Sequence, residues 1–251
     1  MKKNIALITT IVACIISCTS CQKNGSDNLP ASTDKVKTYT EDIISPGIGH
    51  SVMTFNLTYD ANDRIISIAS ATDPRFKTTF SYNSANAYMS DTYSGSDQIT
   101  EYFYYNNNRI DSTFQYNNTG DTSTEKFLYN SSGGLLKSFE YDFSTVTGPD
   151  LQNTTSYTSY DANGNVLKSE DTDGNVDIYD YYTDLVYVHP LIGPALIPTI
   201  KRNLMKTHTL TTSGLHIATV TYTYTFDSNN RMSTEKAVVD DGSVVIKTYT
   251  Y

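Results

Sequence analysis

The sequence predicts an all-β protein, an antiparallel meander of repeated β-hairpins that forms a curled sheet, an open barrel or a two-layer sheet. Three observations predict this class. The 251 residues include 21 Tyr and no Trp, and they are rich in Thr, which suits the half-buried surface of a sheet. Apolar and polar side chains alternate along many segments, and short runs of Asp, Asn and Gly separate these segments. An aromatic residue followed by such a turn recurs, first at intervals of 22 to 25 residues.

Composition and charge exclude several other classes. Charged residues make up only 18% of the chain, and Asp and Glu outnumber Lys and Arg, which gives a net charge of −9. Such a sequence does not form a coiled coil, a helical bundle or a polytopic helical membrane protein. We expect no nucleic-acid partner, because phosphate binding needs clustered Lys and Arg.

The N-terminal residues read as a targeting segment. A basic start precedes an apolar run, Ile5–Ile16, which is too short to span the roughly 30 Å of a bilayer core but fits a secretory signal peptide over residues 1–17. Residues 18–38 are largely polar and are expected to form a flexible tether. The remaining residues, 39–251, are predicted to form a single all-β repeat domain.

The end of the apolar run, Ile15–Cys18 (IISC), resembles the lipobox of bacterial lipoproteins. The resemblance implies cleavage before Cys18 and attachment of lipid to its sulfur, with Cys21 as the alternative site. No cysteine follows Cys21, so the repeat domain has no disulfide. We expect an outer-membrane lipoprotein of the cell envelope, periplasmic or surface-exposed, that contacts the membrane through its lipid anchor.

One phrase recurs along the domain: an aromatic residue, an Asp/Asn-rich turn, and an apolar residue that opens the next strand. Asp, Asn and Gly accept positive φ and close tight turns, so each copy corresponds to one hairpin. At about 11 residues per strand and turn, we expect roughly 14–16 strands, which must curl, close or form two layers. The copies begin at Tyr59, Tyr82, Tyr104, Tyr129, Tyr160 and Phe226.

Alternation within the strands predicts one apolar and one polar face. The apolar side chains of residues 53–59 are expected to share one face. The aromatic and apolar members of residues 219–226 alternate with four threonines, which can face water while favouring extended backbone.

One segment, Leu185–Leu204, departs from this pattern. Pro190, Pro194 and Pro198 lie among Leu, Ile and Val, and proline at this spacing blocks both a helix interior and a central strand. We expect either a loop that covers an open end of the core or an exposed apolar lip that contacts a partner or ligand.

The repeated phrase resembles the YD repeats of RHS-type proteins, whose hairpins curl into a spiralling sheet. Tyr160–Leu167 (YDANGNVL) is the best match and Tyr59–Asp60 the next. Together with the lipobox, the chain resembles uncharacterised β-rich outer-membrane lipoproteins of Bacteroidota type, which carry domains of unknown function. The resemblance implies fold and location and adds no catalytic residue.

Motifs for catalysis are missing from the sequence. It contains no phosphate-binding loop, no Gly-x-Ser-x-Gly and no His-Glu-x-x-His, so we expect no enzyme and no catalytic residue. No cofactor is expected apart from Ca²⁺, for which alternating side-chain oxygens around a glycine turn are suited. A plain Asp-Gly hairpin turn is the alternative explanation of these residues. The candidate calcium ligands are Asp171, Asp173, Asn175 and Asp177.

Two further groups of residues could bind a ligand. A short turn would place His208 opposite His216 and begin a zinc site, which lacks further ligands. Neighbouring tyrosines point to opposite faces of a strand, so some must face outward, where they could hold a ligand. The candidates are Tyr102, Tyr104, Tyr105, Tyr179, Tyr181 and Tyr182.

These features predict a non-catalytic binding or accessory module for a glycan or a peptide. The alternative is a structural or protein-interaction lipoprotein that meets another envelope protein through a sheet edge or through the segment Leu185–Leu204.

Overall fold

The computed structural model describes residues 35–82, 87–94, 96–106, 109–131, 133–144, 148–185 and 203–251. The predicted signal peptide, Cys18, Cys21 and most of the segment 185–204 lie outside these residues. Among the described residues, no helix has the length and hydropathy needed to cross a membrane. They form sixteen strands, which confirms the all-β class. The strands are β1 (Thr38–Ser45), β2 (Gly49–Tyr59), β3 (Ile65–Ser70), β4 (Phe76–Tyr82), β5 (Ala87–Ser94), β6 (Asp97–Asn106), β7 (Arg109–Asn117), β8 (Thr122–Tyr129), β9 (Leu135–Ser144), β10 (Gly148–Tyr160), β11 (Val166–Asp171), β12 (Asn175–Tyr181), β13 (Met205–Thr212), β14 (Leu215–Phe226), β15 (Met232–Val239) and β16 (Val244–Thr250).

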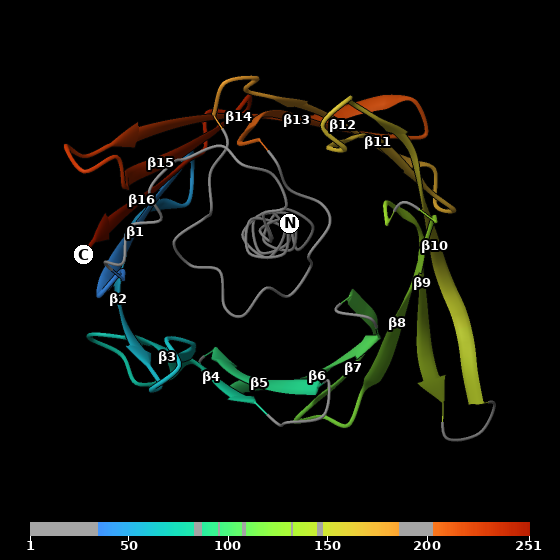
Figure 1. Ribbon diagram of the computed structural model, residues 1–251, viewed down its shortest axis with the longest axis horizontal. Helices are drawn as coiled ribbons and strands as arrows, with labels where there is room; N and C mark the ends of the chain where they lie inside the picture. The colour runs from blue at the N-terminus through green and yellow to red at the C-terminus, as the bar shows by residue number, and fades with distance from the viewer. Residues whose placement is uncertain are drawn as a thin grey trace.

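The strands form a closed barrel. Successive strands are antiparallel neighbours, and β1 pairs with β16 to complete the wall. Figure 1 shows the strands following one another around this wall in chain order. At the seam, Thr40 lies opposite Thr248 on one side and opposite Thr54 on the other. Of the three shapes that the sequence predicts, closure selects the barrel, and it leaves this sheet without a free edge.

The strand connections gather at two rims. In a closed antiparallel meander, all connections that follow even-numbered strands lie at one rim, which here carries the turns at 60–64, 130–134, 161–165 and 227–231. We name it the repeat rim. Connections that follow odd-numbered strands lie at the opposite rim.

Asp and Asn side chains close the turns of the repeat rim. The Oδ1 atom of Asp161 accepts the backbone N–H groups of Asn163 and Asn165, both at 2.8 Å. The position between them, Gly164, has a φ of 81°. Asp60 and Asp227 make the same two hydrogen bonds, and the residue three positions after each also has positive φ. The repeated phrase is therefore rich in Asp, Asn and Gly because this turn needs both a side-chain acceptor and a left-handed position.

In five repeats a β-bulge lies in the strand after the turn, immediately after that strand's first apolar residue. The register shifts between Thr58 and Tyr59, and shifts of the same kind occur before Tyr105, Tyr129, Tyr160 and Phe226. With this bulge, each aromatic residue lies directly opposite the apolar residue that follows its turn. These pairs are Tyr59 with Ile65, Tyr105 with Ile110, Tyr129 with Leu135, Tyr160 with Val166 and Phe226 with Met232.

Tyrosine hydroxyl groups tie hairpin ends together at the repeat rim. Tyr251 follows β16 and donates to the carbonyl of Met232, at the start of β15, over 3.0 Å. Tyr129, at the end of β8, donates in the same way to Ile110, at the start of β7, and Tyr82 makes the equivalent bond. Each bond holds a hairpin closed where no turn joins its strands.

The predicted faces of the strands are confirmed. In β14, Val220 and Tyr222 are buried, whereas Thr221 and Thr223 are exposed. The buried face of a closed barrel is its interior. Directly paired residues of neighbouring strands share a face, so the strand register identifies the inward-facing residues of every strand. Two hydrophobic clusters lie there: Ala218, Val220, Tyr222, Ala237, Val239 and Val245 form one, and Val36, Tyr39, Leu57, Ile65, Leu204, Met232 and Tyr249 form the other.

Candidate binding surface

A group of aromatic side chains lies on the outside of strands β6, β7 and β9. Phe80 on β4 packs against an interior cluster and is paired with Ser90 on β5. Ser90 is paired with Glu101 on β6, and Glu101 with Gln115 on β7, so these residues also face the interior. The adjacent residues Tyr102 and Phe114 therefore point outward, because side chains alternate between faces. We name the group the outer aromatic surface, and it consists of Tyr102, Tyr104, Phe114, Tyr116 and Phe143.

The rings of the outer aromatic surface contact one another. The ring centroids of Tyr102 and Phe114 are 6.4 Å apart, and those of Tyr102 and Tyr116 are 6.3 Å apart. Phe143 meets Phe114 edge-on at 6.4 Å. These separations are within the range of favourable aromatic pairs, so the rings hold one another in place. Tyr104, Phe143 and Tyr116 are nevertheless 43%, 42% and 38% exposed.

Polar groups border the rings. A hydrogen bond with Tyr116, together with partial burial, raises the pKa of Tyr102. Thr100 lies opposite Tyr116 on β6 and donates its hydroxyl hydrogen to Asp91 over 2.6 Å. The outer aromatic surface thus combines exposed ring faces with hydroxyl and carboxylate groups.

The structure divides the first three predicted tyrosines between the two faces. Tyr102 and Tyr104 belong to the outer aromatic surface. Tyr105 lies inside because it follows the outward-facing Tyr104 in the strand, and a bulge at Asp111 in β7 places Ile110 opposite it. Burial raises its pKa. Ligand binding by these tyrosines stays a prediction, and only the first two are placed where an external ligand reaches them.

The other three predicted tyrosines make contacts within the barrel. Tyr179 stacks on His208, with ring centroids 4.8 Å apart. Tyr182 donates its hydroxyl hydrogen to the carbonyl of Tyr222 over 2.9 Å. Tyr181 lies opposite Met205, which packs against an interior cluster. Ligand binding by these three also stays a prediction.

Sequence reasoning missed Phe114, Tyr116 and Phe143. Their alternation with polar residues was visible in the sequence. Strand alternation alone does not say which strands are neighbours. Only the structure shows that Phe114 and Tyr116 lie beside Tyr102 and that Phe143 meets Phe114.

Acidic side chains line the inside of the same part of the wall. Glu125 lies directly opposite Glu140, and Glu101 lies on the interior face of β6. Burial raises the pKa of Glu101 to about 7, and the charge of Glu125 adds to this effect. Burial and the charge of Glu140 also raise the pKa of Glu125, against the effect of a hydrogen bond from Ser138. These carboxyl groups therefore hold their protons to higher pH than carboxyl groups in water.

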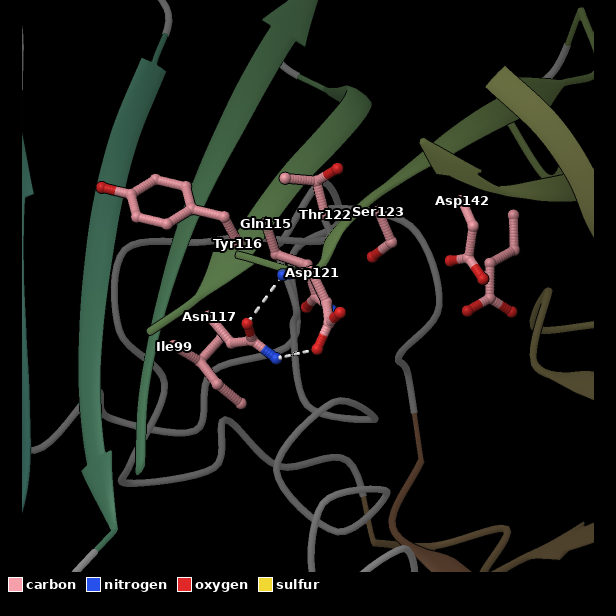
Figure 2. Close-up of a pocket in the computed structure, with 9 residues that line it drawn as sticks. Ile99, Gln115, Tyr116, Asn117, Asp121, Thr122, Ser123 and Asp142 are labelled. Carbon is pink, nitrogen blue, oxygen red and sulfur yellow. Dashed lines mark hydrogen bonds between the residues drawn. The ribbon is translucent and has the colours of Figure 1, made fainter. Parts of the chain in front are cut away.

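A cavity of about 170 Å³ lies beside these acids, toward the opposite rim (Figure 2). Asn117 donates an amide hydrogen to Asp121 over 2.8 Å across the β7–β8 turn, and the ring of Tyr116 points away from this pair. Typical small-molecule sites are larger, at roughly 300–1,000 Å³, so this cavity does not suit a polymer. It is lined by Ile99, Gln115, Tyr116, Asn117, Asp121, Thr122, Ser123, Glu140 and Asp142.

The four candidate calcium ligands have other partners. The Oδ1 atom of Asp171 accepts the N–H groups of Asp173 and Asn175, and its Oδ2 atom accepts the Asn175 amide at 2.7 Å. Asp177 lies on the interior face and is hydrogen-bonded to His208 at 2.6 Å. The described residues contain no group of three or more His, Cys, Asp or Glu arranged to hold a metal ion. Calcium binding here stays a prediction, and it would require these hydrogen bonds to break.

The expected juxtaposition of His208 and His216 is wrong. His208 lies opposite Val220, because the β13–β14 turn is centred on Ser213 and Gly214 and a bulge follows. His208 is hydrogen-bonded to Asp177, and His216 to Asp240.

The fold has counterparts among solved structures. No protein-family model and no curated protein matches the chain. A porin-like protein from Bacteroides uniformis is similar, with a TM-score of 0.60 and 16% identity over 86% of this chain and 96% of that chain. A porin-like protein from Bacteroides vulgatus has a TM-score of 0.48 and 14% identity over 86% of this chain and 98% of that chain. The similarity to the first of these shows a shared barrel fold.

Proposed function

We propose that this chain is a non-catalytic, lipid-anchored protein of the cell envelope that binds a carbohydrate polymer on its outer aromatic surface. The observation that carries the proposal is the contact between the rings of Tyr102, Phe114 and Tyr116 on the outside of the barrel, with centroids 6.3 to 6.4 Å apart. Exposed aromatic groups of this kind mark interaction sites.

The chemistry of the outer aromatic surface suits a carbohydrate. Aromatic rings pack against the apolar faces of sugars, and tyrosine hydroxyl groups can bond to sugar hydroxyl groups. Asp91, which accepts the hydroxyl hydrogen of the buried Thr100, adds a carboxylate to this part of the outer face. Small molecules favour concave pockets, whereas a polymer can lie along the outside of several strands.

Barrel closure disfavours the alternative of a protein partner bound at a sheet edge. Peptides often add to a sheet as an extra strand, and this requires an unpaired edge. Here β1 and β16 are paired through seven residues each. The alternative route, through the segment Leu185–Leu204, falls largely outside the described residues.

Two observations support a location in the cell envelope. The sequence Ile15–Cys18 resembles a lipobox, which implies secretion and lipid attachment at Cys18. The barrel also shares its fold with a protein described as porin-like from Bacteroides uniformis.

The proposal is tested by affinity electrophoresis and calorimetry with a panel of soluble polysaccharides. We expect at least one polysaccharide to bind. Replacing Tyr116 or Tyr102 with Ala should weaken that binding about tenfold, which corresponds to about 1.4 kcal/mol. Tyr116→Phe should retain most of the affinity, because the ring that stacks on the sugar is kept.

The matched control is Ile178→Ala. Ile178 is 49% exposed and lies on β12, outside the outer aromatic surface. Its replacement should leave polysaccharide binding unchanged, and thermal unfolding should show that all variants fold. Binding of peptides alone, or an equal loss in Ile178→Ala and Tyr116→Ala, would contradict the proposal.

A further inference from the structure

The outside of the barrel around the seam is a threonine surface. One row of directly paired residues crosses five neighbouring strands, from β2 through β1, β16 and β15 to β14. Adjacent hydroxyl oxygens in the row lie 3.0 Å apart between β1 and β2 and 2.7 Å apart between β14 and β15. The row consists of Thr54, Thr40, Thr248, Thr234 and Thr225.

Charged side chains lie on the same outer face around the wall. Asp42 on β1 is hydrogen-bonded to His50 on β2 at 2.6 Å. Asp180 on β12 and Lys206 on β13 form an ion pair at 3.2 Å. Lys236 is exposed in the middle of β15. A charge that faces lipid destabilises a transmembrane barrel most strongly near the middle of the bilayer.

The interior combines hydrophobic clusters near the seam with charged side chains, among them Glu41, Lys247 and Glu235. Val220, Ala237 and Val245 pack together inside the barrel. A transmembrane barrel has an apolar band on the outside of all its strands, and the interior of a porin is polar. In this chain apolar side chains are exposed on several other strands as well, but charged residues interrupt them. Val52 lies directly opposite Asp42, Leu128 opposite Lys137 and Ile178 opposite Lys168.

We infer that the barrel is not a pore in the membrane. Its wall lies in water, and the chain meets the membrane only through the acyl chains of its N-terminal cysteine. The second statement rests on the lipid anchor of the proposed function. The first rests on the threonines and charged side chains of the outer face and is independent of that anchor.

The inference is tested by labelling single cysteines with a membrane-impermeant maleimide. The full chain carries Cys21→Ser and one new cysteine, and labelling is compared between broken membranes, detergent solution and denaturant. Lys236→Cys and Thr223→Cys place a thiol on the outer face, and we expect no loss of labelling rate in membranes relative to detergent. Ala237→Cys is the matched interior control, because Ala237 adjoins Lys236 and is buried, and it should react only in denaturant.

The inference would be overturned if the cysteines at both outer positions were protected from the maleimide in membranes and became reactive in detergent. Alkaline washing gives a second readout. Cys18→Ser combined with Cys21→Ser should move the chain from the membrane to the soluble fraction, and its retention after the wash would also count against a wall in water. If the chain is labelled at position 236 in membranes but binds no polysaccharide, this inference stands and the carbohydrate proposal is wrong.

Discussion

At the scale of single residues, the turns depend on side chains that accept backbone N–H groups. Asp161 shows this most fully, because its Oδ2 atom also accepts the side-chain amide of Asn165 at 2.6 Å. Asn165 is buried and donates a second hydrogen bond to Asn203. One carboxylate therefore orders a repeat turn and links it to the chain that enters β13.

Replacing Asp161 with Ala should lower the free energy of unfolding by about 2 kcal/mol, because buried N–H groups of Asn165 lose their acceptor. Urea unfolding measures the change. Asp173→Ala is the matched control, since Asp173 is an exposed turn residue whose backbone, rather than its side chain, makes the turn hydrogen bond. Equal effects of the two substitutions would show that the acceptor role of Asp161 is unimportant.

The raised pKa of Glu101 predicts a dependence of stability on pH. Its pKa rises from 4.5 to about 7 in the folded state, so the folded protein binds more protons than the unfolded chain between these values. The stability contributed by this group is fully present below pH 4.5 and is lost as the pH rises through about 7.

Glu101→Gln should therefore stabilise the protein at pH values above 7, by about 1 kcal/mol once screening by water in this partly exposed site is included. The difference from the wild type should shrink as the pH falls toward 4.5. Thermal unfolding across this pH range measures the effect. A variant that is less stable than the wild type at every pH would show that burial does not destabilise the Glu101 carboxylate.

At the scale of elements, the repeat unit is an aromatic residue, a turn, a buried apolar residue and a bulge. The bulge places the aromatic residue and the apolar residue on the interior face together, as in Tyr105 and Ile110. The side chain of Ile110 is 1% exposed, and its backbone carbonyl accepts a hydrogen bond from the hydroxyl group of Tyr129. Each hairpin thus closes over its own apolar residue at the repeat rim.

Ile110→Ala should destabilise the barrel by about 2–5 kcal/mol, because it leaves a cavity under the repeat rim. Leu128→Ala on the neighbouring strand is the control. Leu128 is 48% exposed, so its replacement should cost no more than about 0.5 kcal/mol. Chemical unfolding compares the two, and similar losses would mean that the buried residue does not stabilise the repeat.

At the scale of the whole molecule, stability depends on the pairing of the first and last strands. The register at the seam places Thr40 opposite Thr248 and Thr38 opposite Thr250. The first and last of the described strands, Thr38–Ser45 and Val244–Thr250, therefore meet in one antiparallel pair. Closure of this kind satisfies the backbone groups that an open sheet would leave exposed at its edges.

Engineered cysteines test this closure in a chain whose Cys14, Cys18 and Cys21 are replaced by Ser. Thr40→Cys with Thr248→Cys should form a disulfide, because directly opposite residues have Cβ atoms about 5 Å apart. Thr40→Cys with Thr250→Cys is displaced by two residues and should remain reduced. Non-reducing electrophoresis and mass spectrometry distinguish the pairs. Equal oxidation of both would contradict the register of the seam.

Local features of this fold could be predicted from the sequence. The turns around Asp60, Asp161 and Asp227 follow from the residues that occupy them, because turn geometry depends on four or five consecutive positions. The alternation of residues 219–226 fixed which side chains share a face, and the repeat period predicted the number of strands. Each of these signals acts within one hairpin.

The tertiary structure decided which residues meet. A bulge at Asp111 in β7 brings Ile110 to the same face as Tyr105, and the turn at Ser213 and Gly214, with the bulge that follows it, separates His208 from His216. The outer aromatic surface arises because β8 pairs with both β7 and β9 and so brings the rings of β9 next to those of β6 and β7. The sequence by itself determined the hairpins, since their interactions are local. Closure and the candidate binding surface depend on pairing between distant strands, which a local pattern does not specify.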